Sequence, residues 1–238
     1  MPQPRKLHDR FFKQAKAEGY LARSAYKLKE IQERYPLIRP GDFVLDLGCA
    51  PGSWLQVASE LTGRDGVVVG IDLKPTDERA LAWGPARVVA KVGDAFTADA
   101  SSLLSELGVE HRMFDVLLSD MAPNTSGHGD DLLSSRLCRR VLELAPAVLR
   151  PGGMLAMKIL EGSEYPAVLA ETGAMFSQAR GYKPQSSRDV SREIFIIARN
   201  FVGPSQSAGT RRVGKGGPPK PGAGWGGGWS EGSGGGGR

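Results

Sequence analysis

Cysteine and histidine are scarce in this chain. Among its 238 residues, the cysteines are Cys49 and Cys138, and the histidines are His8, His111 and His128. Two cysteines are too few for a disulfide framework, and these residues do not follow the spacing of a zinc site. We therefore expect no metal centre, and we expect a protein of the reducing cytoplasm.

Long hydrophobic runs are also missing. No stretch approaches the roughly 20 apolar residues that a membrane-spanning helix needs. The first residues, MPQPRKLHDRFFKQ, lack the apolar core of a signal peptide. Apolar residues still make up 40% of the chain, which is ample for one hydrophobic core. The composition predicts a soluble cytoplasmic protein that does not bind a membrane.

The net charge of +5 is unevenly distributed. Residues 1–34 carry nine Lys/Arg and four Asp/Glu, residues 35–202 carry 17 and 21, and residues 203–238 carry five and one. A weakly acidic body between basic ends favours polyanion binding at the ends, although the same pattern can serve solubility alone. We divide the chain into a basic helical extension (1–34), a folded domain (35–202) and a basic tail (203–238).

The tail has the composition of a disordered segment. Fifteen of its 36 residues are glycine, so it cannot bury enough apolar surface to offset the entropy lost on ordering. Its tryptophans and basic residues are typical of a flexible segment that contacts nucleic acid. A plain solubilising linker is the open alternative.

The most informative stretch is FVLDLGCAPGSW, residues 43–54. An apolar strand at 43–47 ends at Gly48, and a helix is predicted over 53–62. In open α/β sheets, such a turn lies at the carboxyl edge where ligands bind. The G-x-x-x-G spacing of Gly48 and Gly52 does not fit a dinucleotide, but it leaves room for a ligand without phosphates, such as S-adenosylmethionine. A connection without any ligand is the alternative.

Short apolar runs alternate with helical patterns elsewhere. Besides 43–47, strands are predicted at 67–73, 86–90, 114–118, 154–159, 176–182 and 194–198. Helices are predicted at 8–19, 24–34, 53–62, 77–83, 99–107, 132–149 and 163–176. Ser24 is a plausible N-cap of the second helix, and Pro151-Gly152-Gly153 should close the helix at 132–149. The predicted fold class is α/β, with a mostly parallel seven-stranded sheet, one antiparallel last strand and helices on both faces.

Polar side chains stand where several of these strands end. They are Asp46, Asp72, Asp94 and Asp120, while Lys158 interrupts MLAMKIL. Asp72 is placed to accept hydrogen bonds from ribose hydroxyls, and Asp94 could meet an adenine amino group. Strand-end polar residues commonly have no such role. A buried lysine, however, needs an acidic partner, and Asp120 at the end of the preceding strand is the obvious candidate for Lys158.

Two further residues can join this edge. An antiparallel last strand would begin there with Glu193, and Lys27 flanks the apolar face of the second helix, where a solvated position is the usual outcome. Together with Asp120 and Lys158 they could orient and deprotonate a hydroxyl group. An ordinary lysine has a pKa of about 10.4, so it acts as a base only with help from desolvation, a nearby cation or late proton loss.

The chain resembles the FtsJ/RrmJ family of ribose 2′-O-methyltransferases over residues 23–199. The similarity is carried by RSAYKLKEI, DLGCAPGSW, IDL, GDAF, SDMAPN, LRPGG, MKIL and SREIF. It implies a Rossmann-like, S-adenosylmethionine-dependent methyltransferase. The catalytic tetrad it implies is Lys27, Asp120, Lys158 and Glu193, with Lys158 at the position of the catalytic lysine. The cofactor-binding residues it implies are Gly52, Trp54, Asp72, Asp94 and Asp120.

The expected reaction is methyl transfer to a ribose 2′-hydroxyl, on a uridine of 23S rRNA in the large (50S) ribosomal subunit, by a monomer. Ser53, where bacterial ribosomal members carry a second glycine, and the tail depart from the family pattern. The alternatives are a tRNA ribose methyltransferase, a base or protein amino methyltransferase, and a non-catalytic ribosome-assembly factor. An NAD-linked oxidoreductase fits worst, because the glycine spacing is wrong.

Overall fold

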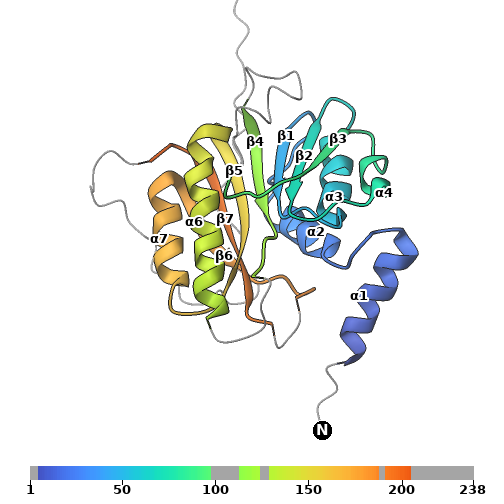
Figure 1. The fold of residues 1–238 in the computed structure, drawn as a ribbon, viewed down its shortest axis with the longest axis horizontal. Coiled ribbons are helices and arrows are strands. Elements are labelled where there is room, and N and C mark those ends of the chain that lie inside the picture. The colour runs from blue at the N-terminus through green and yellow to red at the C-terminus, as the bar shows by residue number, and fades with distance from the viewer. Residues whose placement is uncertain (1–4, 98–112, 124–128, 188–190, 205–238) are drawn as a thin grey trace, which may run out of the picture.

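The computed structural model describes residues 5–97, 113–123, 129–187 and 191–204 (Figure 1). The helices are α1 (Arg5–Glu18), α2 (Ala25–Arg34), α3 (Ser53–Thr62), α4 (Glu78–Leu81), α6 (Asp130–Val148) and α7 (Tyr165–Met175). The strands are β1 (Phe43–Leu47), β2 (Val67–Asp72), β3 (Arg87–Val92), β4 (Phe114–Ser119), β5 (Leu149–Leu160), β6 (Phe176–Tyr182) and β7 (Glu193–Phe201). The helix predicted at 99–107 and most of the predicted tail lie outside these residues.

The seven strands form one sheet in the order β3-β2-β1-β4-β5-β7-β6. Strands β3, β2, β1, β4 and β5 pair in parallel, whereas β7 is antiparallel to both of its neighbours. The predicted fold class, including the single antiparallel strand, is confirmed. Because β7 runs the opposite way, its first residue, Glu193, lies at the edge where the parallel strands end.

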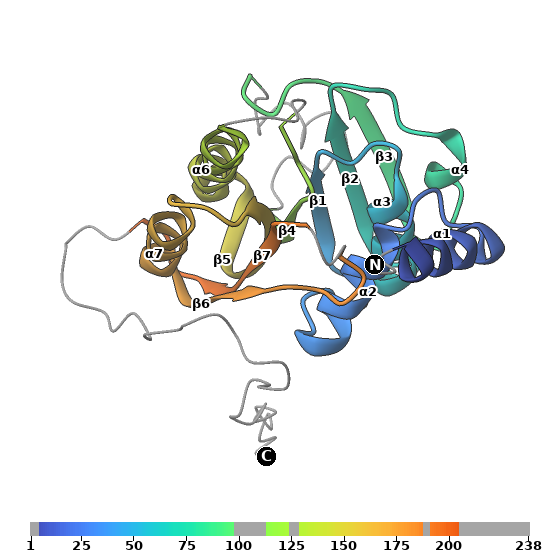
Figure 2. The same cartoon turned by 90° about the horizontal axis from the view of Figure 1, so that it is seen from below.

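Helices cover both faces of the sheet (Figure 2). Helices α6 and α7 pack on one face, in the hydrophobic cluster that contains Leu45 and Leu47 of β1. Helices α2 and α3 pack on the other face, in the cluster that contains Val44. Strand β1 is buried throughout because its alternating side chains enter both clusters. This explains its continuous apolar sequence.

One local prediction was wrong, and another was confirmed in position but without the expected capping bond. The helix predicted at 132–149 ends at Val148, and the LRPGG segment belongs to β5 instead of closing the helix, because Leu149 pairs with Phe114 of β4. Ser24 does occupy the N-cap position of α2, but its side chain makes no capping bond. Its hydroxyl instead lies 2.7 Å from that of Ser53, at the start of α3.

Helix α2 is part of the core. Its residues Ala25, Leu28 and Ile31 are fully buried in the same cluster as the strands. The division of the chain at residue 34 stays a prediction, since α2 packs as closely as the helices that follow it. Within the described ranges, no helix has the length and apolar character needed to cross a membrane.

Candidate active site

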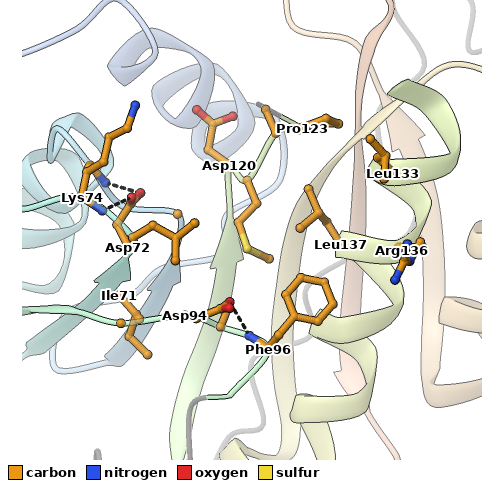
Figure 3. A pocket seen from close by; sticks show the side chains of 17 residues that line it. Ile71, Asp72, Lys74, Asp94, Phe96, Asp120, Pro123, Leu133, Arg136 and Leu137 are labelled. Atoms are coloured by element: carbon orange, nitrogen blue, oxygen red, sulfur yellow. Dashed lines mark hydrogen bonds between the residues drawn. The ribbon is translucent and has the colours of Figure 1, made fainter. Parts of the chain in front are cut away.

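A cavity of about 480 Å³ lies at the carboxyl edge of the sheet (Figure 3). Its walls come from the segments that follow β1, β2, β3 and β4, and from the first turns of α6. The lining residues are 48, 50, 71–74, 93–96, 120–123, 133, 136 and 137. This is the edge at which open α/β sheets bind ligands.

Asp72 lies at one end of the cavity. Its Oδ2 accepts a hydrogen bond from the Ala50 backbone N–H at 2.9 Å, and its Oδ1 accepts one from the Lys74 N–H at 2.9 Å. These bonds tie the glycine turn after β1 to the end of β2. The carboxylate is thereby fixed in the wall, where it can accept further bonds from a ligand's hydroxyl groups.

Asp94 and Phe96, from the segment after β3, form another part of the wall (Figure 3). Asp94 Oδ1 accepts a hydrogen bond from the Phe96 backbone N–H at 2.9 Å, which closes a tight turn. Phe96 is 44% exposed. Arg140 of α6 donates from Nε to the Ala95 carbonyl at 3.0 Å. The turn is therefore held from both sides, with an apolar ring beside a carboxylate.

Gly52 and Trp54 do not line this cavity. Gly52 has a φ of 118°, and a Cβ there would collide with Ala80 of α4. The Trp54 side chain is 2% exposed and donates from Nε1 to the Ser24 carbonyl at 2.8 Å. Both residues thus have clear packing roles, and their assignment to the cofactor stays a prediction.

Lys158 forms the expected pair with Asp120. Its Nζ lies 2.8 Å from Asp120 Oδ1 and also donates to the Asp120 backbone carbonyl. The two side chains are 6% and 19% exposed. Asp120 also lines the cavity, so this ion pair borders the space in which a ligand would lie.

Lys27 and Glu193 form a second ion pair. Lys27 Nζ lies 2.8 Å from Glu193 Oε2, with side-chain exposures of 7% and 22%. Burial alone would raise the pKa of the Glu193 carboxyl, but the charge and hydrogen bond of Lys27, with the charge of Lys158, hold this pKa below its ordinary value. The charge of Lys158 thus also acts on Glu193, which links the two ion pairs electrostatically.

Both pairs lie on the sheet face that α2 covers. Lys158 of β5 is directly opposite Phe195 of β7, two residues after Glu193. Because side chains alternate along a strand, Glu193 and Phe195 point to the same face. Phe195 is fully buried in the cluster that contains α2, which places Lys27 above them.

Sequence reasoning missed several residues of the cavity wall. Leu133, Arg136 and Leu137 come from α6. In the sequence, Leu133 and Leu137 were recognisable only as part of the apolar face of a helix, which carried no signal of a ligand site. Arg136 carried none. Among the described residues, no group of three His, Cys, Asp or Glu side chains is arranged to hold a metal ion.

The mostly parallel sheet, its antiparallel seventh strand and the cavity at its carboxyl edge define a Rossmann-like α/β protein with a ligand site at the usual edge of the sheet. The family model of FtsJ-like methyltransferases matches residues 20–201. The chain belongs to this family.

Curated relatives cover most of the chain. It is 45% identical over 193 residues to the ribosomal RNA large subunit methyltransferase E of Syntrophobacter fumaroxidans, which covers 80% of this chain and 94% of the relative. It is 43% identical over 201 residues to the protein of the same name from Desulfatibacillum aliphaticivorans, covering 83% and 92%. A crystal structure described as a ribosomal RNA methyltransferase of Plasmodium falciparum has a TM-score of 0.64 and 27% identity, over 77% of this chain and all of the other.

Proposed function

We propose that the protein transfers a methyl group from S-adenosylmethionine to a ribose 2′-hydroxyl of RNA, at a uridine of 23S rRNA in the large ribosomal subunit. The observation that carries the proposal is the double role of Asp120, which lines the cavity and binds Lys158. The names of the relatives support the substrate. The enzyme would act as a monomer in the cytoplasm.

The cavity suits the cofactor in size and chemistry. Its volume of about 480 Å³ lies within the usual range of small-molecule sites. Asp72 would accept the ribose hydroxyls, Asp94 the adenine amino group, and Asp120 would lie near the methionine part. Gly52 and Trp54 would contribute backbone groups, since the Trp54 ring is buried in the core. When bound, the cofactor supplies a methyl group on a sulfonium, which is open to attack by a hydroxyl oxygen.

The two ion pairs would prepare the acceptor hydroxyl. The contacts of Lys158 with the Oδ1 and the backbone carbonyl of Asp120 would hold the amine in place, where it would accept or steer the hydroxyl proton. Lys27 and Glu193 would position the nucleoside. Alignment of the reacting groups can supply about 7–11 kcal/mol of the barrier reduction.

Replacing Lys158 tests its role. Lys158→Met keeps the apolar stem but removes the amine, so methyl transfer should fall by about 100-fold or more. Turnover is measured with tritiated cofactor and RNA. Calorimetric titration of cofactor is the control, and it should still detect binding. Full activity of this variant on its true RNA would refute the assigned role.

The substrate is tested by methyl transfer to hypomethylated 50S subunits and to total tRNA, followed by nuclease mapping of the labelled nucleoside. Label in a 2′-O-methylated uridine of 23S rRNA is the expected result. Label in tRNA alone would keep the chemistry but overturn the substrate. Label on a base would favour an amino methyltransferase, and no label on either RNA would favour a non-catalytic assembly factor.

A further inference from the structure

Glu30 of α2 binds the backbone of a distant turn. The turn spans residues 183–187 and follows β6. Glu30 Oε2 accepts the Gln185 N–H at 2.6 Å, and its Oε1 accepts the Ser186 N–H at 2.9 Å. Both carboxylate oxygens are thus used, in two hydrogen bonds of the strong, charge-assisted kind.

Helix α2 also contacts the strands that precede and follow this turn, β6 and β7. Tyr35, just after α2, packs edge-on against Tyr182 at the end of β6, with ring centroids 5.3 Å apart. Lys27 binds Glu193, the first residue of β7, at 2.8 Å. Lys27 and Glu30 are three residues apart and therefore neighbours on one face of the helix. Glu30 therefore holds the turn from the same helix face that carries Lys27 and its partner Glu193.

The turn contains two buried polar side chains. Ser186 and Ser187 are 3% and 5% exposed, and within the described ranges neither hydroxyl oxygen has a hydrogen-bond partner. Burying an unsatisfied hydroxyl is unfavourable. The attachment of the turn to α2 therefore depends strongly on the two bonds to Glu30.

We propose that Glu30 is a positioning residue, which holds the 183–187 turn against α2 as a wall of the acceptor-nucleoside site beside the Lys27–Glu193 pair. This inference rests on the proposed function, because the wall has a role only if an RNA ribose binds at the pair. Glu30 itself does not contact the reacting groups. It acts through the turn, which limits the orientations that the acceptor nucleoside can take.

The test compares Glu30→Gln with Glu33→Gln, an exposed glutamate on the same helix. The Glu30 variant keeps its size but has one carbonyl oxygen in place of two carboxylate oxygens, so at least one bond to the turn is lost. Hydrogen exchange of the Gln185 and Ser186 amides should speed up, and kcat/KM for RNA should fall about tenfold. The cofactor Kd and the melting temperature should stay near those of the wild type. Glu33→Gln should change none of these quantities.

A double-mutant cycle separates positioning from general destabilisation. On a Lys27→Met background, Glu30→Gln should lower kcat/KM much less than tenfold, because both changes disturb the positioning of the same acceptor nucleoside. Faster amide exchange with unchanged kcat/KM would overturn the positioning role and leave the proposed function intact. Unchanged exchange would overturn the attachment itself. A wild type that methylates no RNA would overturn the proposed function, and the positioning role would fall with it.

Discussion

Asp46 is the most unusual single residue near the site. It is fully buried in β1, and within the described ranges neither carboxylate oxygen has a hydrogen-bond partner. Burial, and then the negative charges of Asp120 and Asp72, raise the pKa of this carboxyl well above its ordinary value. The raised pKa favours the neutral form of this carboxyl, which would add no negative charge beside Asp72 and Asp120.

Asp46 should make stability depend on pH. Because its pKa is higher in the folded state, its contribution is fully present below the unfolded pKa of about 3.9 and is lost as the pH rises through the folded pKa. Asp46→Asn cannot ionise, so its melting temperature should rise relative to the wild type as the pH increases. Thermal melts across the pH range measure this difference. Asp65→Asn, at an exposed position, is the control, and a pH-independent difference for Asp46→Asn would contradict the prediction.

The turn between β1 and α3 depends on the conformation of Gly48. This residue has a φ of +81°, and a Cβ there would lie 2.7 Å from Met121 Cγ and 3.0 Å from the Met121 backbone N. Met121 directly follows Asp120 and lines the cavity. The glycine therefore lets the loops after β1 and β4 approach each other, and Gly48 and Met121 both line the cavity.

Gly48→Ala should weaken both the fold and the cofactor site. The left-handed backbone costs an alanine about 1–2 kcal/mol, and the contact with Met121 adds to this. Gly41→Ala is a matched control, since Gly41 has a φ of +83° and nothing within 4 Å of an added Cβ. Urea unfolding should show a larger loss of stability at Gly48, and calorimetry should show weaker cofactor binding only there. Equal losses at both positions would show that the close approach is unimportant.

Elements that are fixed by local sequence were predicted correctly, whereas an element that depends on contacts with distant residues was not. Strand β1 and helix α3 were predicted with their observed bounds, because burial on both faces and local turn residues fix them. The start of β5 was missed, because Leu149 becomes extended by pairing with Phe114. The same distinction holds in the site. The Lys158–Asp120 pair follows from the cost of burying a lysine, whereas the bonds of Glu30 go to backbone groups that have no side-chain signature.

Helix α1 is rich in basic residues, with five Lys/Arg against two Asp/Glu. This helix is anchored by its buried Ala15 and by the Phe11 ring, 5.5 Å from that of Tyr26. Phe12, which follows Phe11 in the helix, is 61% exposed. Figures 1 and 2 show α1 at the outer side of the α2–α3 layer. A basic helix held in this way can extend the RNA-binding surface beyond the site itself.

Removing the basic residues of α1 should reduce the salt dependence of RNA binding. The variant replaces Arg5, Lys6, Arg10 and Lys13 by alanine. Each lost phosphate contact should lower the slope of log K against log salt by about 0.7–0.9. Fluorescence anisotropy with labelled RNA over a salt series measures the slope. Arg64→Ala, exposed in the loop between α3 and β2, should leave it unchanged, and an unchanged slope in the α1 variant would rule out these contacts.

The reversed direction of β7 also constrains how this protein can evolve. The pairing of Leu160 with Glu193 and of Lys158 with Phe195 sets the parity of the strand. Deleting or inserting one residue within β7 would turn Glu193 toward the opposite face, away from Lys27, even where the sheet still formed. Changes in steps of two residues would preserve the facing. Proteins that descend from this chain should therefore carry fewer single-residue insertions and deletions in β7 than packing alone would predict.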